Sequence, residues 1–228
     1  MAVELVFENR SKVGAMIQDS LLMIKRSSTH IIRNTDQLLG AFFQPIMFLV
    51  LFASVFGGSI EKALPGGVSY INFLMAGIIV QTVAFGSTTT AIAVSTDLKK
   101  GIVDRFKSLP MSNLAVLNGH VVSDIFRNAI STTVMIVSGF VIGFRPQADL
   151  MGWLQIIGIL LLFTFAFSWL SAIIGVLAKS VEAVQWLTFV IIFPLTFASS
   201  AFTPTAGMGK YLKAFAENQP ITQVVESI

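Results

Sequence analysis

Long runs of apolar residues alternate along this chain with short stretches that carry the charged residues. A helix needs about 20 consecutive apolar residues to cross roughly 30 Å of hydrocarbon. Four runs reach this length without an ionisable residue, and a fifth of similar length carries three ionisable residues near its start. The pattern predicts five membrane-spanning helices, at residues 38–56, 71–94, 114–144, 152–178 and 183–202.

Composition indicates the same fold class, an all-α integral membrane protein. The 228 residues are 54% hydrophobic and 12% charged, and the mean hydropathy is +0.80. Soluble domains carry about 25% charged residues. Five spans and their short connections leave no room for a soluble domain, so residues 1–228 are expected to form one transmembrane domain. The absence of cysteine excludes disulfide bonds, thiolate metal sites and a cysteine nucleophile.

The distribution of lysine and arginine predicts the orientation of the chain. Eleven of these residues fall in the N-terminal segment, around the connection after the second span, and between the fourth and fifth spans, whereas four fall on the other side. This asymmetry predicts a cytoplasmic N-terminus for a multi-pass protein of the plasma membrane. Because the basic residues flank spans, the net charge of +3 indicates contact with membrane lipids and not with nucleic acid.

The segment before the first span, residues 1–37, is basic and amphipathic. From Val13 to Ile32 its apolar residues recur at three- and four-residue steps, with lysine and arginine among them. Such a helix settles in the membrane interface and is expected to lead into the first span as an elbow. A soluble helix that binds a partner is the alternative. No compact apolar core lies near Met1, so a cleavable signal peptide is not expected.

The segment after the fifth span, residues 203–228, is too polar to cross the membrane. Its apolar positions recur at helical spacing and are Met208, Tyr211, Leu212, Phe215 and Ala216. Pro220 then breaks this pattern. The segment is expected to form one or two short amphipathic helices that lie on the outer surface or dip into it. A plain solvated tail is the alternative.

The connection between the second and third spans, residues 95–113, has the pattern of a short cytoplasmic helix. Ser95, Thr96 or Asp97 is expected to cap its N-terminus, and Pro110 to end it. Leu98, Ile102, Phe106 and Leu109 fall on one face, and charged residues occupy the rest. Two interpretations remain open: a solvated interfacial helix, or a docking element for a cytoplasmic partner with Phe106 as its aromatic anchor.

The ionisable residues within the spans are His120, Asp124 and Arg127, all near the start of the third span. Asp124 and Arg127 are three residues apart and share a helix face, so a structural ion pair is expected. The alternative is an ion-coupled carrier or channel that uses Asp124 and His120.

Signatures of catalysis are absent from the sequence. The chain has no G-x-x-x-x-G-K-[ST] motif for nucleotide phosphates, and the spans offer no His/Glu ligand cluster and no Ser/His dyad that shares a face. The sequence therefore predicts no catalytic residue, no metal and no cofactor in this chain. If the protein transports, another subunit is expected to supply the energy.

Five short motifs occur in an order that is typical of one membrane-protein family. They lie at residues 44–48 (Gln-Pro-Ile-Met-Phe), 70–78 (Tyr-Ile-Asn-Phe-Leu-Met-Ala-Gly-Ile), 99–112, 199–204 (Ser-Ser-Ala-Phe-Thr-Pro) and 218–222 (Asn-Gln-Pro-Ile-Thr). Over nearly its whole length the chain resembles the permease of a type-2 ATP-binding-cassette exporter, of the daunorubicin-resistance branch that exports drugs or lipids. The family has a sixth span, which has no counterpart up to Ile228.

The resemblance implies an assembly and a function. Two permease copies, identical or related, would pair in the membrane above two ATPase subunits, which bind ATP and Mg²⁺. The complex would export an amphipathic drug, antibiotic or lipid from the cytoplasm or the inner leaflet. The connection after the second span would be the coupling helix that receives ATP-driven motion. Its implied coupling residues are Asp97, Leu98, Lys99, Lys100, Gly101, Ile102, Arg105, Phe106, Leu109 and Pro110.

The resemblance also implies a substrate path between the two permease copies, lined by the second and fifth spans and closed by outer re-entrant helices. Polar residues of these spans that suit a weakly polar path are Gln81, Thr82, Thr88, Ser199 and Ser200. Small and hydroxyl residues also permit close helix packing, which is the alternative interpretation. Pro194 predicts a local break near the end of the fifth span.

Overall fold

The computed structural model describes residues 21–24, 35–61, 64, 69–103 and 115–228. Within these residues it contains helices and no strand, which confirms the all-helical fold class. The long helices are α3 (Thr35–Ile60), α4 (Tyr70–Gly86), α5 (Thr88–Lys99), α7 (Ala115–Ile142), α8 (Leu150–Leu177) and α9 (Val181–Phe197). A 3-10 turn, Thr205–Gly207, and the short helices α10 (Lys210–Glu217) and α11 (Pro220–Glu226) complete the chain.

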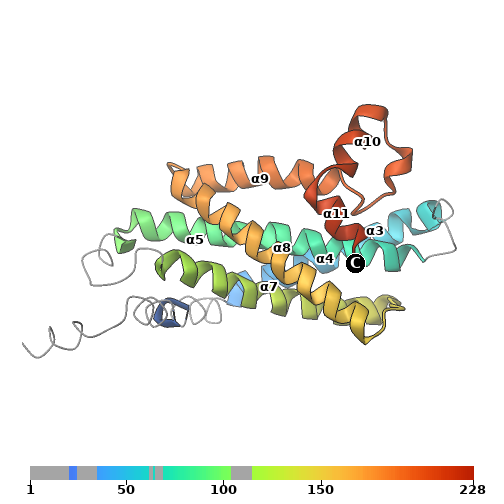
Figure 1. Ribbon diagram of the computed structural model, residues 1–228, viewed down its shortest axis with the longest axis horizontal. Helices are drawn as coiled ribbons and strands as arrows, with labels where there is room; N and C mark the ends of the chain where they lie inside the picture. Colours follow the sequence, from blue (N-terminus) through green and yellow to red (C-terminus); the bar gives the residue numbers. More distant parts are fainter. Residues whose placement is uncertain (1–20, 25–34, 62–63, 65–68, 104–114) are drawn as a thin grey trace, which may run out of the picture.

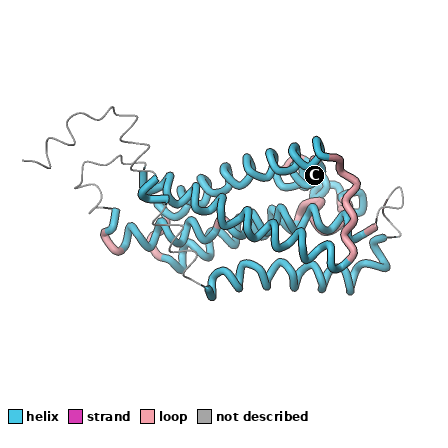
Figure 2. Tube along the Cα trace, turned by 90° about the horizontal axis from the view of Figure 1, so that it is seen from below, coloured by secondary structure: helices cyan, strands magenta, loops and turns pink. Residues whose placement is uncertain are grey.

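The long helices lie side by side as an elongated bundle (Figure 1). The end of α5, the start of α7 and the α8–α9 turn gather at one end of the bundle. The end of α3, the start of α4 and the α7–α8 connection gather at the other end, together with α10 and α11 (Figures 1 and 2). The C-terminal segment therefore lies at the opposite end of the bundle from the predicted coupling connection.

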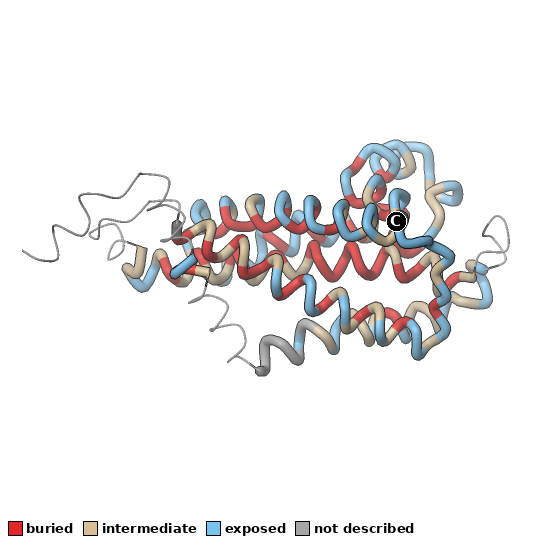
Figure 3. Tube along the Cα trace, turned by 60° about the horizontal axis from the view of Figure 1, so that its bottom comes forward, coloured by how far each residue is buried: buried red, intermediate tan, exposed pale blue. Residues whose placement is uncertain are grey.

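Across the described ranges of the chain, four helices are long and apolar enough to cross a membrane: Phe42–Ile60, Tyr70–Lys99, Val116–Ile142 and Leu150–Leu177. The fifth apolar helix, α9, is shorter, with 17 residues. Burial is concentrated along α4, whereas the outward faces of α7, α8 and α9 expose large apolar side chains (Figure 3). Exposed apolar side chains over long helices are the expected pattern where lipid is the solvent. The chain is a multi-pass membrane protein.

The second span continues past the predicted run at residues 71–94 and is interrupted at Ser87, between α4 and α5. It ends where the backbone N–H of Lys100 bonds the carbonyl of Thr96 at 3.0 Å and Gly101 adopts a φ of +65°. This left-handed conformation favours glycine and is common just after a helix.

The predicted helix N-cap at Ser95, Thr96 or Asp97 is therefore wrong, because these residues lie inside α5. Ser95 and Asp97 are buried against neighbouring helices instead of facing solvent. The interruption that separates α5 from the following connection falls at Gly101. Ile102 is helical again, whereas Arg105, Phe106, Leu109 and Pro110 lie outside the described residues.

A short part of the predicted elbow, residues 21–24, is helical and packs on the start of α7. Met23 is buried in a small cluster with Val116 and Val103, and a side chain at Gly119 would collide with Met23. The Ser123 hydroxyl donates to the carbonyl of Ile24 at 3.3 Å. These contacts join the N-terminal segment to α7, while the remainder of the elbow up to residue 34 lies outside the described residues.

The C-terminal segment forms helices, so the solvated-tail alternative is wrong. Pro220 occupies the first turn of α11, where its missing N–H costs nothing. Ile221, Thr222 and Val225 are buried, and α11 contacts α4 and α8. On α10, in contrast, large side chains remain exposed, namely Tyr211, Leu212 and Phe215.

Candidate functional site

A polar network lies inside the bundle where the second span is interrupted. The backbone N–H of Thr90 bonds the carbonyl of Ser87 at 3.0 Å, a spacing of three residues instead of the helical four. This turn leaves the carbonyl of Gly86 available for another donor. The interruption thus exposes a backbone acceptor inside an apolar helix, where an unsatisfied carbonyl costs several kcal/mol, of order 2–7.

The donor that reaches this carbonyl is Arg127 of α7. Its guanidinium donates to the Gly86 carbonyl, to Thr89 Oγ1 at 2.9 Å and to the carboxylate of Asp124. Arg127 and Asp124 are only 3% and 2% exposed. The structure therefore brings together the two residues that the spacing of three predicts as an ion pair, and it also ties them to the break in the second span.

The second carboxylate oxygen of Asp124 accepts a hydrogen bond from the Ser168 hydroxyl of α8. Ser171, one turn along α8, donates to the Ser87 hydroxyl at 3.0 Å. The network consequently links α4, α5, α7 and α8 at one level of the bundle. Its single positive and single negative charge balance, and both are hydrogen-bonded, which is the condition for burying charge at tolerable cost.

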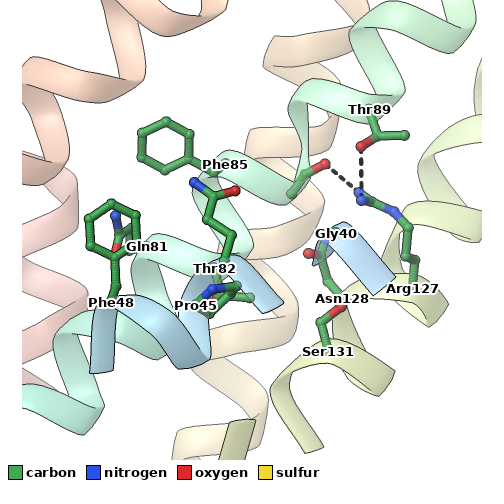
Figure 4. Close-up of a pocket in the computed structure, with 12 residues that line it drawn as sticks. Gly40, Pro45, Phe48, Gln81, Thr82, Phe85, Thr89, Arg127, Asn128 and Ser131 are labelled. Carbon is green, nitrogen blue, oxygen red and sulfur yellow. Dashed lines mark hydrogen bonds between the residues drawn. The ribbon is translucent and has the colours of Figure 1, made fainter. Parts of the chain in front are cut away.

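Next to this network is a pocket between α3, α4 and α7 with a volume of about 160 Å³. Its polar wall contains Gln81, Thr89, Arg127, Asn128 and Ser131, and Phe48 and Phe85 form an apolar wall (Figure 4). The amide oxygen of Gln81 and the amide nitrogen of Asn128 are buried and have no hydrogen-bond partner among the described residues. Both residues line the pocket, so its wall contains an acceptor and a donor that are not engaged by this part of the chain.

A second polar contact lies closer to the end of the bundle. His120 Nε2 is 3.1 Å from Asp97 Oδ2, and both side chains are about one-tenth exposed, at 10% and 11%. This contact joins the last turn of α5 to α7. The resemblance places Asp97 in the coupling segment. Its contact with His120 holds the end of α5 against α7, where the connection between these helices begins.

The five predicted substrate-path residues do not share one site. Gln81 and Thr82 line the pocket, whereas Thr88 is half-buried and does not. Ser199 and Ser200 lie just after α9, where the backbone N–H of Ser200 bonds Thr222 Oγ1 of α11 at 3.2 Å. These two serines join the end of α9 to the C-terminal helices.

Several residues of the site are missing from the sequence prediction. Asn128 and Ser131 follow Arg127 at one and four residues, so they extend the polar face of α7 that starts at His120. Reading this whole face would have found them. Ser168 shares a helix face with Thr164 and Ser171, which lie four residues before it and three residues after it, so this hydroxyl face of the fourth span is the signal that would have indicated it. In the described part of the chain, no group of three or more His, Cys, Asp or Glu side chains is placed to hold a metal ion.

A bundle of long apolar helices with a neutralised polar core defines the class as a polytopic membrane protein. The chain belongs to the ABC-2 type transporter family, whose model matches residues 19–228. It is 29% identical over 186 residues to the daunorubicin resistance ABC transporter permease protein DrrB1 of Streptomyces coeruleorubidus, which covers 82% of this chain and 65% of the relative. The doxorubicin resistance ABC transporter permease protein DrrB of Mycobacterium tuberculosis is 26% identical over 192 residues, 81% of this chain and 65% of that protein. The chain spans about two thirds of the length of these relatives.

Proposed function

We propose that this chain is the membrane-spanning subunit of an ATP-driven exporter that moves an amphipathic drug, antibiotic or lipid out of the cytoplasm or the inner leaflet. The observation that carries the proposal is the family match over residues 19–228 of a multi-helix membrane bundle. Two relatives are named as ABC transporter permease proteins for daunorubicin and doxorubicin resistance, which supports a drug as the exported compound. In this proposal the chain itself catalyses nothing and holds no cofactor.

The proposed partners are an ATP-binding-cassette ATPase, which carries ATP and Mg²⁺, and a second permease copy. The ATPase would dock where α5 and α7 approach their connection, at the cytoplasmic face of the plasma membrane. Gly101 separates α5 from the connection, and the Asp97–His120 contact holds α5 to α7 at its base. A push on the connection would therefore reach both helices together.

The docking proposal predicts that the double variant Arg105→Glu with Phe106→Ala loses the ATPase. Charge reversal beside removal of an aromatic anchor is expected to weaken association at least about tenfold. The measurement is co-purification with an ATP-binding-cassette subunit from the same organism, after co-expression and detergent extraction. Lys210→Glu with Tyr211→Ala is the matched control, because it makes the same kind of change at the other end of the bundle.

The co-purification experiment has three informative outcomes. Loss of the ATPase in the first variant alone, with substrate-stimulated ATP hydrolysis in the unaltered complex, supports both the class and the docking segment. Equal ATPase recovery from both variants contradicts the docking role of Arg105 and Phe106. If neither the unaltered chain nor a version extended beyond Ile228 binds the ATPase, the exporter proposal itself fails.

The alternative function, an ion-coupled carrier or channel, requires Asp124 to bind and release an ion. Because Arg127 and Ser168 already engage both carboxylate oxygens of Asp124, this residue is expected to hold structure and not to load and release an ion. Purified permease in liposomes, without ATPase, is therefore expected to carry no proton or sodium flux. A flux that is present in the unaltered protein and absent in folded Asp124→Asn would favour the ion-coupled carrier instead.

A further inference from the structure

We propose that the pocket between α3, α4 and α7 binds the uncharged polar head of an amphipathic molecule, one that carries both a hydrogen-bond acceptor and a donor. That this molecule is the exported compound rests on the proposed function, whereas the binding itself does not. The pocket lies within one chain and includes α3, which the sequence prediction did not associate with substrate.

The first argument is the pair of unpartnered amides. Gln81 and Asn128 are 4% and 2% exposed, and Gln81 Oε1 and Asn128 Nδ2 make no hydrogen bond to any residue that the structure describes. Most buried polar groups in proteins are satisfied, so two exceptions that line one pocket need an explanation. An amide presents a carbonyl and an NH₂ group, so the two side chains together can serve a donor and an acceptor on the same ligand.

The second argument concerns charge. Arg127 lines the pocket, but Asp124 neutralises it through a direct ion pair. An anion entering the pocket would gain no unbalanced positive charge to offset the loss of its hydration, and a cation would meet the guanidinium. Charged groups are costly to desolvate unless they are paired. A neutral head is therefore the ligand that this wall accommodates.

The third argument is access and size. Gly40 and Gln44 of α3 line the pocket and are exposed, and a side chain at Gly40 would meet no atom within 4 Å. Only 6% of the apolar stretch of α3 is buried, so this mouth opens on the flank of the bundle. Drug-sized ligands occupy pockets of about 300–1,000 Å³. The observed volume of about 160 Å³ admits a head against the wall that contains Phe48 and Phe85, while an apolar remainder extends out of the pocket.

The test uses hydroxyflavone, a neutral fluorescent ring compound that carries an adjacent carbonyl and hydroxyl, with purified permease in lipid nanodiscs. We expect hydroxyflavone to bind saturably. Flavone is expected to bind more weakly, because it lacks the hydroxyl that would donate a hydrogen bond to Gln81 Oε1. Gln81→Leu is expected to abolish the preference for hydroxyflavone over flavone, which is about tenfold if it reflects one buried hydrogen bond.

Access is tested by a glycine pair on the same helix. Gly40→Leu places a side chain in the mouth and is expected to weaken binding more than about tenfold. Gly58→Leu is the matched control, because a side chain at Gly58 also meets no atom within 4 Å and Gly58 does not line the pocket. Equal binding by the two variants, or no saturable binding of either hydroxyflavone or a short-chain diacylglycerol, would overturn the proposal.

Further binding measurements show whether the polar head belongs to a lipid or to an aromatic compound, and whether it must be uncharged. Competition by a short-chain diacylglycerol, which is neutral and carries a hydroxyl and ester carbonyls, would support a lipid as the occupant. Hydroxyflavone binding without this competition would support an aromatic compound. If hydroxyflavone sulfonate, an anion, bound as tightly as hydroxyflavone, the conclusion of a neutral head would be wrong. These measurements need no ATPase, so their failure is distinct from failure of the exporter proposal.

Discussion

Arg127→Met is expected to destabilise the folded protein by about 3–5 kcal/mol, because it leaves the carboxylate of Asp124 buried without its cationic partner. The same change removes the donors that serve the Gly86 carbonyl and Thr89. The free energy of unfolding, measured in detergent against a denaturing surfactant, is the quantity to compare. Fluorescence size-exclusion chromatography would show the accompanying loss of folded protein in membranes.

The matched control for Arg127→Met is Lys213→Met on α10. Lys213 Nζ lies 3.6 Å from Glu217 Oε1, and both side chains are more than two-fifths exposed. An exposed helix pair of this kind contributes about 0.5 kcal/mol or less. If the two methionine variants proved equally stable, the buried network would not hold α4, α5, α7 and α8 together as the structure indicates.

A second variant separates the two possible causes of the loss. Arg127→Met combined with Asp124→Leu removes both charges, and well-packed apolar residues often replace a buried pair at little net cost. The double variant is therefore expected to recover most of the stability that the single variant loses. A double variant as unstable as the single one would mean that the hydrogen bonds to Gly86 and Thr89 carry the effect, and not the unpaired carboxylate.

The Asp124–Arg127 ion pair shows which contacts the sequence predicts and which it does not. A spacing of three residues predicts that Asp124 and Arg127 share a helix face, and the two side chains meet in the structure. Their remaining partners, Gly86, Thr89 and Ser168, come from positions 38–44 residues away in the chain. Which residue faces Arg127 depends on the rotation of each helix in the bundle, and apolar periodicity is weak in helices surrounded by lipid and protein alike.

The helix-cap error has a related cause. In a soluble protein Ser95, Thr96 and Asp97 would be natural capping residues. Here Thr96 Oγ1 bonds the carbonyl of Ile92 within α5 at 2.7 Å, and Asp97 faces His120 of α7. Polar residues at helix–helix contacts look the same in a sequence as polar residues at helix ends. The glycine at 101 was the more informative residue, because its conformation ends the helix.

The pocket could not be predicted either, because its lining depends on how each helix is rotated in the bundle. Gly40, Gln81 and Asn128 lie on three helices whose relative rotation the sequence leaves open, so no spacing along the chain brings them together. Gln81 and Thr82 stand out in the sequence as polar residues in an apolar span, and both line the pocket. Sequence patterns identified unusual residues in the spans, whereas tertiary packing determined which of them share a cavity.

Gly77→Ala is expected to loosen the end of the bundle that carries the C-terminal helices. A methyl group at Gly77 of α4 would overlap the backbone carbonyl of Ala201, which follows α9. The same segment is held by the Tyr70 hydroxyl, which donates to the Phe202 carbonyl at 3.1 Å, and by Phe202 against Phe52, with ring centroids 4.6 Å apart. Overpacking of this kind costs about 1–3 kcal/mol, which exceeds the roughly 1 kcal/mol that alanine gains over glycine in a helix.

A single cysteine makes this loosening measurable, because the chain has none of its own. Ser200→Cys places a thiol where the native side chain is 4% exposed, so labelling by a maleimide reports opening of the segment. In this background we expect Gly77→Ala to raise the labelling rate by up to about thirtyfold, the factor that corresponds to a net loss of about 2 kcal/mol. Gly58→Ala is expected to leave the rate unchanged, since nothing lies within 4 Å of its added methyl group. Equal rates in the two variants would mean that α4 can shift to admit the methyl group, and that the close approach of Gly77 to Ala201 does not hold this end of the bundle closed.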